Sequence, residues 1–409
     1  MVYDQTRLIE FSGFLEKLAS SLDLTEAQYR DATERYQKLG NFLNEDGSSL
    51  APFNPIIAAQ GSFALGTIIK PETDEEQYDV DLTCVLNLSP KDVTQQSLKK
   101  MVGDRLKESP VYSRILGEEK RRCWPLNYAE GTRFHMDVVP AIPDIEALDI
   151  LRQMMIPSNI TLSAICITDK ETWDKDVNWP RSNPRGYITW FKSRMQLQFD
   201  VIRQRFLNLE MRGKVEDIPE FRFKTPLQRA IQILKRHRDR RYSGEPDLKP
   251  ISIILTTLAA HVYENEETIY QTLMNLLDKM PRLIKYENGI YTISNPVDPR
   301  ENFADKWNEN PKKALAFFEW MKLAKADLEY IFSLKGWDQI TKKGSAIFGE
   351  SVMRRLIAQY GEEMRILRER GNLTMEQSGL LSTTASTVVR PHQFSTHTLD
   401  DYFSTHKPC

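Results

Sequence analysis

The sequence of 409 residues is poor in cysteine, lacks long apolar runs and carries almost no net charge. Its four cysteines are scattered and form no CxxC pair, which argues against a structural zinc site and against a disulfide framework. No apolar run reaches the roughly 18–20 residues that cross a bilayer, and the first residues lack the apolar core of a signal peptide. We therefore expect a cytoplasmic protein that does not contact a membrane.

Charge and hydrophobicity are balanced as in ordinary globular proteins. The chain has 55 Lys and Arg against 57 Asp and Glu, a formal charge of -2, and 41% of its residues are hydrophobic. This composition excludes a disordered chain, a fibrous repeat and a polycationic nucleic-acid coat, and it argues against tight RNA binding. At roughly 150 residues per domain, the length predicts two packed units.

The first 50 residues predict two helices. In the first, apolar residues three and four apart share one face: Leu8, Phe11, Leu15, Leu18 and Leu22. The second is expected to begin after Thr25, which fits a capping box with Gln28, and to end near Asn44.

Three later stretches define the remaining organisation. Residues 173–190 are rich in Trp, Pro and Asn, which predicts a loop or an extended crossing rather than a long helix. Helical periodicity then dominates, with helix starts near Pro226 and Pro250. From Gly371 onward the chain is rich in Ser and Thr and has little periodicity, which predicts a flexible tail.

Two stretches predict strands that carry acidic residues. Residues 79–88 alternate, so that Asp79 and Asp81 face away from the apolar positions of the strand. Residues 133–139 alternate in the same way, with Asp137 opposite an apolar face. The proline that follows is expected to end this second strand, because proline has no N–H to donate.

The paired carboxylates indicate a site for divalent cations. Two close carboxylates repel each other unless a cation lies between them, although a solvent-facing strand also tolerates two acidic residues. If the two strands are neighbours, Asp79, Asp81 and Asp137 converge into a set of oxygen ligands suited to Mg²⁺. Two Mg²⁺ ions, for which Mn²⁺ could substitute, would clamp a nucleoside triphosphate and activate an attacking hydroxyl.

A glycine–serine turn precedes these strands. Gly61 and Ser62 stand before a predicted short helix over 63–69. Glycine lets the backbone approach a phosphate, and a helix start offers free N–H groups. An ordinary turn is the alternative interpretation.

The order of these motifs resembles that of the polymerase-β-type nucleotidyltransferases: a Gly-Ser turn, a DxD pair and a single Asp on a later strand. The text of QGSFALGT, YDVDLTCVL and HMDVVPAIP more specifically resembles the bacterial cyclic-oligonucleotide synthases of anti-phage defence, the cGAS/DncV-like or CD-NTase family. So do the later segments TPLQRAIQILKRHRDRRY, KPISIILTTLAAHVY and NPVDPRENFADKW. Together these segments span most of residues 1–330.

The resemblance implies an α+β fold. A polymerase-β-like nucleotidyltransferase core over residues 51–195 would follow an N-terminal helical spine over 1–50. A helical domain over 196–370, like that of oligoadenylate synthase, would face the core across the active-site cleft. Residues 371–409 would form the flexible tail, where some relatives carry a conjugation or docking point for a regulatory partner.

The resemblance also assigns roles to residues. Asp79, Asp81 and Asp137 would bind the metal ions, and Asp137 would also take the proton from the attacking ribose hydroxyl. Contacts to the nucleotides would come from six further residues: Gln60, Gly61, Ser62, Lys235, Ser252 and Asn295. Lys235 belongs to a basic cluster that also fits a solvated helix end. Asn295 stands where relatives often carry a base-contacting Asp.

The implied reaction joins nucleoside triphosphates, ATP among them, into a cyclic di- or trinucleotide and releases pyrophosphate. The product would be a second messenger in the anti-phage system called CBASS. One alternative is a transferase that adds nucleotides to an RNA 3′ end or to a protein. Another is a nucleotide sensor that has lost the chemistry, and the presence of all three carboxylates argues against it.

Overall fold

The computed structural model describes residues 5–73, 77–128, 134–174, 178–209, 223–334, 337–369, 374–375 and 381–382. The chain divides into two compact units, Met1–Met353 and Arg354–Cys409. The first unit contains the main sheet and the helices from α1 (Gln5–Ser21) to α14 (Trp337–Phe348), and α15 (Glu350–Glu369) crosses the boundary.

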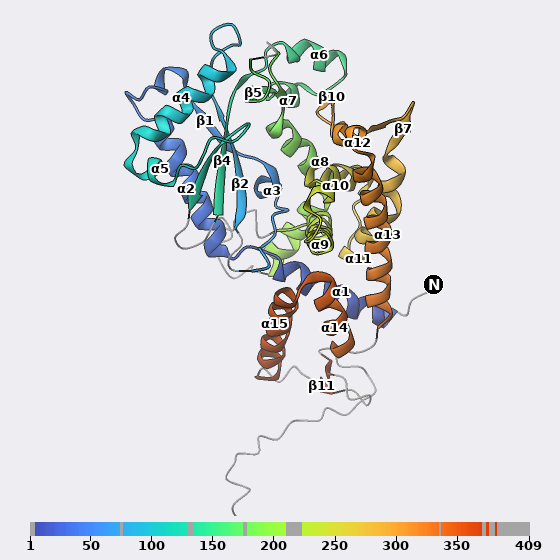
Figure 1. The fold of residues 1–409 in the computed structure, drawn as a ribbon. Coiled ribbons are helices and arrows are strands. Elements are labelled where there is room, and N and C mark those ends of the chain that lie inside the picture. Colours follow the sequence, from blue (N-terminus) through green and yellow to red (C-terminus); the bar gives the residue numbers. More distant parts are fainter. Residues whose placement is uncertain are drawn as a thin grey trace, which may run out of the picture. The chain divides into compact units, whose positions relative to one another are not determined.

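A mixed six-stranded sheet lies in the first unit (Figure 1). Its strands are β1 (Ile56–Ala59), β2 (Tyr78–Val85), β3 (Trp124–Tyr128), β4 (Phe134–Pro143), β5 (Ile165–Ile167) and β6 (Arg181–Ser182). They run in the order β1-β2-β4-β5-β6, and β3 also pairs with β4. Strands β2 and β4 are parallel, and the other pairs of this sheet are antiparallel.

Apolar residues at alternating positions bury one face of this sheet. Val80, Leu82 and Cys84 of β2 are fully buried and belong to one hydrophobic cluster with Met136 and Val138 of β4. Helices on this face supply the other side of the cluster: α2 (Glu26–Leu43), α4 (Gln95–Glu108) and α5 (Pro110–Ile115). Because side chains alternate along a strand, the acidic residues between the apolar positions face away from this cluster.

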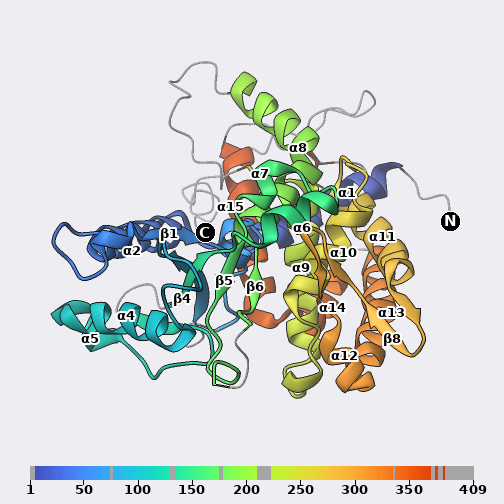
Figure 2. The same ribbon diagram turned by 90° about the horizontal axis from the view of Figure 1, so that it is seen from above.

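The helical half of the first unit is built around one buried helix. Its helices are α8 (Pro184–Leu209), α9 (Pro226–Arg241), α10 (Ser252–Val262), α11 (Ile269–Lys279), α12 (Asp305–Glu309), α13 (Pro311–Ser333) and α14 (Trp337–Phe348). Figure 2 shows α9, α10, α11 and α13 beside one another, away from β4 and α4. Helix α9 contacts α1, α10, α11, α13 and α14, which explains why nearly every residue from its start to Arg238 is buried.

Among its described residues, the first unit contains eight further helices and strands. They are α1 (Gln5–Ser21), α3 (Gly61–Ala64), α6 (Ala147–Gln153), α7 (Ser158–Thr161), β7 (Lys285–Glu287), β8 (Ile290–Thr292), β9 (Ser294–Asn295) and β10 (Asp298–Asn302). Single 3-10 turns lie at Ala51–Phe53, Pro246–Leu248 and Met280–Leu283.

The two predicted N-terminal helices are confirmed as α1 and α2. Phe11, Leu15, Leu18 and Leu22 are buried, as their shared face requires. Helix α2 begins after Thr25, and both hydrogen bonds of the predicted capping box are present.

The predicted loop over 173–190 is wrong in its last part, because α8 begins at Pro184. The N–H of Gly186 donates to Oδ1 of Asn183 at 2.9 Å, so Asn183 caps the helix. Proline occupies the first helical position, where no N–H is needed.

The prediction that Pro140 ends its strand is also wrong, because β4 continues to Pro143. The pairing of β3 with β4 ends at Val138, and the pairing of β5 begins at Ala141. The N–H of Leu86 donates to the carbonyl oxygen of Ala141, so the backbone groups of Ala141 face β2. Because backbone groups alternate in direction along a strand, those of Pro140 face the opposite edge of β4, in the gap between its pairings with β3 and β5. The missing N–H therefore costs no ladder bond.

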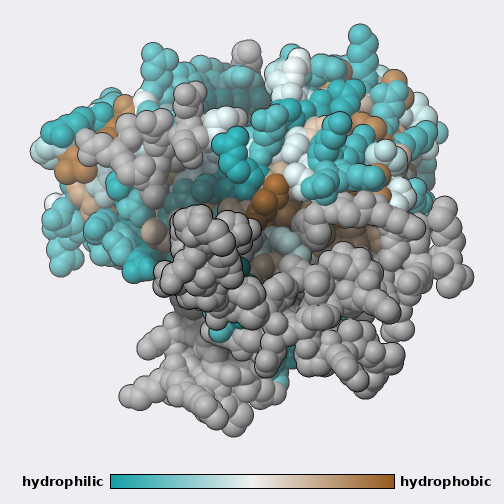
Figure 3. Space-filling view, turned by 90° about the horizontal axis from the view of Figure 1, so that it is seen from below, coloured by the Kyte–Doolittle hydropathy of each residue, from teal (hydrophilic) through white to brown (hydrophobic). Residues whose placement is uncertain are grey.

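Most of the predicted tail over 371–409 lies outside the described residues. Two short strands are described there, β11 (Thr374–Met375) and β12 (Leu381–Ser382), which pair with each other. The division of the chain at residues 50, 195 and 370 stays a prediction. Within the described ranges, no helix is both long and apolar enough to span a membrane. Hydrophilic residues cover most of the coloured surface on the face drawn in Figure 3.

Candidate active site

The three predicted carboxylates lie on the two parallel strands. The register of β2 and β4 sets Asp81 directly opposite Asp137, and Asp79 opposite His135. Asp79 is exposed, whereas Asp81 and Asp137 are half-buried. Since all three alternate with residues of the buried cluster, they share the other face of the sheet. The two acidic strands are therefore neighbours, as the sequence predicted.

Burial and mutual repulsion perturb this group. Burial, followed by the charges of Asp79 and Asp137, raises the pKa of Asp81 to about 6. Although the side chain of Asp79 remains exposed to solvent, partial desolvation by the surrounding chain and the charge of Asp137 also raise its pKa. The positive charges of Lys235 and Lys120 lower the pKa of Asp81 but do not offset this increase. Carboxylates with raised pKa values, close to one another, are stabilised by an added cation.

The glycine of the Gly-Ser turn lies against one of these carboxylates. Gly61 has a φ of 61°, and a Cβ added there would lie 2.3 Å from Oδ2 of Asp81. Both the backbone conformation and the space therefore require glycine. The N–H of Gln60 donates to the carbonyl oxygen of Asp81 at 2.8 Å, which ties the turn to β2.

The helix predicted over 63–69 begins earlier and is shorter than expected. Helix α3 is a single turn, Gly61–Ala64. It ends before Gly66, which has a φ of 66° and would clash with the side-chain amide of Gln228 if it carried a Cβ. Ser62 lies in α3, half-buried, and its carbonyl oxygen accepts the N–H of Thr67 at 3.0 Å.

Helix α9 of the helical half holds the segment that follows α3. Its side chains donate to this segment as follows: Gln228 to the carbonyl oxygen of Leu65 at 2.9 Å, Gln232 to that of Ile68 at 2.8 Å, and Lys235 to that of Thr67 at 3.1 Å. The three donors lie three and four residues apart, so they share one face of α9. The sequence suggested only Lys235 of these three.

Lys235 is a buried cation close to the carboxylates. It is 4% exposed, and its ammonium group also lies 3.2 Å from Oγ1 of Thr67. Burial, reinforced by the charge of Arg238, lowers the pKa of Lys235 to about 7, although Asp239 and Asp81 act in the opposite direction. The interpretation of Lys235 as part of a solvated helix end is therefore wrong.

Ser252 and Asn295 have other partners in the structure. Oγ of Ser252, the first residue of α10, accepts a hydrogen bond from Arg238 at 2.9 Å. Asn295 is buried, and its Nδ2 donates to Glu301 at 2.7 Å. The structure thus places the Gly-Ser turn and Lys235 close to the carboxylates. Ser252 is bound to Arg238, which lies one turn after Lys235 on α9. Asn295 is instead bound to Glu301.

Two residues close to Asp137 were not predicted from the sequence. Nζ of Lys120 lies 3.1 Å from both carboxylate oxygens of Asp137. Cys123 is buried, and its burial, followed by the negative charge of Asp137, raises the pKa of its thiol. The available signal was the basic run of residues 120–122, but only the turn before β3 determines which of its charges reaches Asp137.

Relatives of this chain were identified by sequence. The family model for the nucleotidyltransferase domain of DncV-like cyclic GMP-AMP synthases matches residues 55–140, which include all three carboxylates. The chain is 32% identical to a c-di-GMP synthase of Roseivirga ehrenbergii over 325 residues, 76% of this chain and 79% of that protein. The chain belongs to the DncV-like nucleotidyltransferases. It is also 25% identical to the cyclic dinucleotide synthase CdnG of Bradyrhizobium diazoefficiens over 313 residues, 72% of this chain and 70% of CdnG.

A solved structure confirms the α+β nucleotidyltransferase fold. The structure of B. diazoefficiens CdnG in complex with GTP superposes with a TM-score of 0.67 at 20% identity, and the match covers 85% of this chain and 97% of CdnG.

The carboxylates of this nucleotidyltransferase suit a divalent cation in chemistry but not in their present spacing. In the ranges that the structure describes, no three His, Cys, Asp or Glu side chains are close enough together to hold a metal ion. The donor set consists of oxygens, which hard cations prefer, and burial together with the charges of Asp79 and Asp137 holds the pKa of Asp81 above its usual value. The chemistry of these residues thus fits a divalent cation, but one that bound here would have to draw the carboxylates closer together.

Proposed function

We propose that this protein is a cyclic dinucleotide synthase. The ribose hydroxyl of one nucleoside triphosphate would attack the α-phosphorus of another, and the bond to pyrophosphate would break. A second such step would close the ring. The observation that carries the proposal is the pairing of Asp81 with Asp137 across β2 and β4, with Gly61 against Asp81. The names of two relatives, a c-di-GMP synthase and CdnG, support the cyclic product.

The relatives favour guanine nucleotides as substrates. One is named for c-di-GMP, and CdnG was solved with GTP. We therefore propose GTP as a substrate, although the sequence suggested ATP.

Asp79, Asp81 and Asp137 would hold the metal, for which we propose two Mg²⁺ ions with Mn²⁺ as a substitute. Bound there, the ions would neutralise the triphosphate and lower the pKa of the attacking hydroxyl. Asp137 would accept the proton of that hydroxyl.

The remaining residues would position the nucleotides. The backbone at Gly61 can approach a phosphate closely because no Cβ intervenes, and Gln60 and Ser62 flank it. Lys235 would turn its ammonium from Thr67 to the triphosphate, and Ser252 would assist it. For Asn295 we retain the expectation of a base contact, which requires its bond to Glu301 to be exchanged.

The reaction can be tested with purified protein and Mg²⁺. We expect GTP alone to yield a phosphatase-resistant cyclic dinucleotide by mass spectrometry. We expect no product from the double variant Asp79→Ala, Asp81→Ala. Label that appears only on added RNA or protein would overturn the proposal in favour of an acceptor transferase. Nucleotide binding without any product would overturn it in favour of a sensor.

We further propose that the product acts as a second messenger in anti-phage defence. The same double variant should then lose protection against phage in plating assays. Truncation at residue 371, with activity and partner pull-down measured in parallel, tests the proposed role of the tail in binding a partner.

A further inference from the structure

A short turn before β3 brings a positive charge to Asp137. We call residues 117–123 the basic turn. It is closed by a hydrogen bond from the N–H of Lys120 to the carbonyl oxygen of Cys123 at 3.2 Å. The ammonium group of Lys120 holds both carboxylate oxygens of Asp137 at 3.1 Å.

A buried lysine on α4 fixes the backbone of this turn. Lys99 is fully buried, and its ammonium group donates to the carbonyl oxygen of Lys120 and, at 2.8 Å, to that of Arg121. The carboxylate of Glu119 lies 3.5 Å away. Burial of an ammonium group is unfavourable unless hydrogen bonds compensate it. Here the compensation comes from the basic turn itself, so the charge of Lys99 holds the turn in place.

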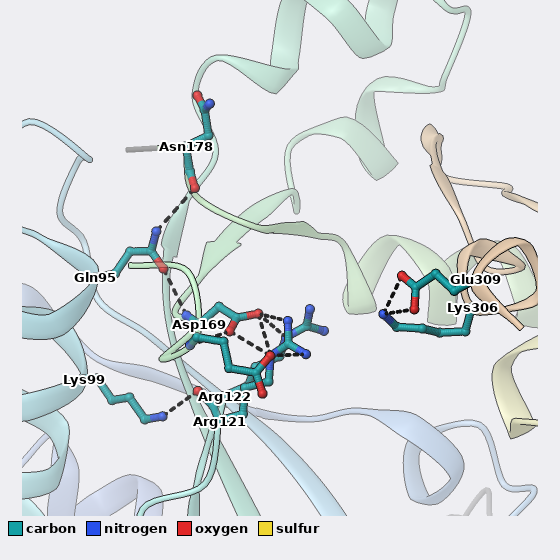
Figure 4. A network of polar contacts seen from close by, with 9 residues as sticks. Gln95, Lys99, Arg121, Arg122, Asp169, Asn178, Lys306 and Glu309 are labelled. Carbon is teal, nitrogen blue, oxygen red and sulfur yellow. Dashed lines mark hydrogen bonds and ion pairs between the residues drawn. The ribbon is translucent and has the colours of Figure 1, made fainter. Parts of the chain in front are cut away.

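A buried aspartate orients the other two cations of the turn. Asp169 is 1% exposed, and one of its oxygens lies 2.7 Å from NH2 of Arg121 and 3.1 Å from Nε of Arg122. Its own N–H donates to Gln95 of α4 at 3.0 Å. Figure 4 shows Lys99 directed at the backbone and both arginines gathered on Asp169. Of the three consecutive cations, Lys120 is thus the one directed at Asp137.

We propose that Lys120 is an internal cation that competes with the catalytic metal for Asp137, and that Lys99 and Asp169 are positioning residues that hold it there. The inference rests on the proposed function, in which Asp137 binds metal. Mg²⁺ binds carboxylate oxygens at about 2.0–2.1 Å, so it needs an oxygen that Lys120 now holds. Lys120 is about half exposed (52%), so its ion pair adds little to stability and is readily exchanged. The turn thus keeps Asp137 paired until metal displaces the lysine.

The test measures the binding of Mn²⁺ alone to the nucleotide-free protein. Binding is detected as a decrease in the electron paramagnetic resonance signal of free Mn²⁺. We expect Lys120→Met to bind Mn²⁺ about fivefold more tightly than wild type, the upper limit for one exposed ion pair. Lys120→Arg should bind like wild type, because the competing charge remains. The matched control is Lys100→Met, which removes the same charge from an exposed position on α4 and should leave the affinity unchanged.

Lys99→Met tests the positioning role. It should raise the Mn²⁺ affinity in the same direction as Lys120→Met, and the double variant should gain nothing over Lys120→Met alone. If Lys99→Met does not fold, the comparison of Lys120→Met with Lys120→Arg still decides the competition.

Failure of this inference differs from failure of the proposed function. If wild type and Asp79→Asn, Asp81→Asn bind Mn²⁺ equally, there is no metal site at the carboxylates and both proposals fall. If that double variant loses binding but Lys120→Met binds no more tightly than wild type, only the competition by Lys120 is refuted.

Discussion

Asp81→Asn should stabilise the metal-free protein while abolishing its activity. The folded protein raises the pKa of Asp81 from 3.8 to about 6, through burial and the charges of Asp79 and Asp137. A difference of one pKa unit corresponds to about 1.4 kcal/mol, so ionised Asp81 costs the folded state about 3 kcal/mol. Because the side chain is half-buried rather than enclosed, solvent screening reduces our expectation to about 2 kcal/mol. Asparagine removes the charge at nearly constant volume and also removes a metal ligand.

The pH dependence follows from the sign of the change. A carboxyl with a raised folded pKa favours the folded state at low pH, and this contribution is lost as the pH rises through about 6. The advantage of Asp81→Asn should therefore be complete near about pH 7.5 and fall by about half at about pH 5. The measurement is the urea unfolding midpoint in EDTA at both pH values.

The matched control is Asp92→Asn. Asp92 is an exposed carboxylate whose pKa is lowered by hydrogen bonds from Ser89, so its replacement should not stabilise the protein. The reasoning is refuted if Asp81→Asn is no more stable than wild type at the higher pH, or if its advantage does not shrink at the lower one.

Three further outcomes are expected. Gly61→Ala should abolish activity, and it should destabilise the protein more than Gly47→Ala does. Both glycines have a positive φ, but only a Cβ at Gly61 would clash with Asp81. Equal urea unfolding midpoints of the two variants would contradict this reasoning. Binding of GTP at about pH 8 should take up about 0.5–1 proton, because the triphosphate recharges Lys235, whose pKa is lowered to about 7. Calorimetry in buffers of different ionisation enthalpy measures this uptake, and its persistence in Lys235→Met would exclude that source. Asn295→Asp should lower the free energy of unfolding in urea by about 2 kcal/mol, because the new carboxylate repels that of Glu301. Adding Glu301→Gln should restore the stability, and a loss that persists in the double variant would exclude this contact as its cause.

The sequence alone was sufficient for features that depend on neighbouring residues. The alternation around Asp79 and Asp81, the capping box at Thr25 and the helix after Pro226 are set within one or two turns of chain, and all three are present. The choice of Lys235 came from the resemblance to a family, since its local pattern also fitted a solvated helix end.

Tertiary structure decided which distant residues meet. The helix at Pro184 depends on the cap from Asn183, and the composition around it concealed that cap. Lys120 reaches Asp137 because Lys99, 21 residues earlier, holds the backbone of the basic turn. Lys235 reaches Thr67 across 168 residues of chain. Side-chain pattern fixes which face of an element is buried, but the partners on that face follow from packing between elements, which no local pattern encodes.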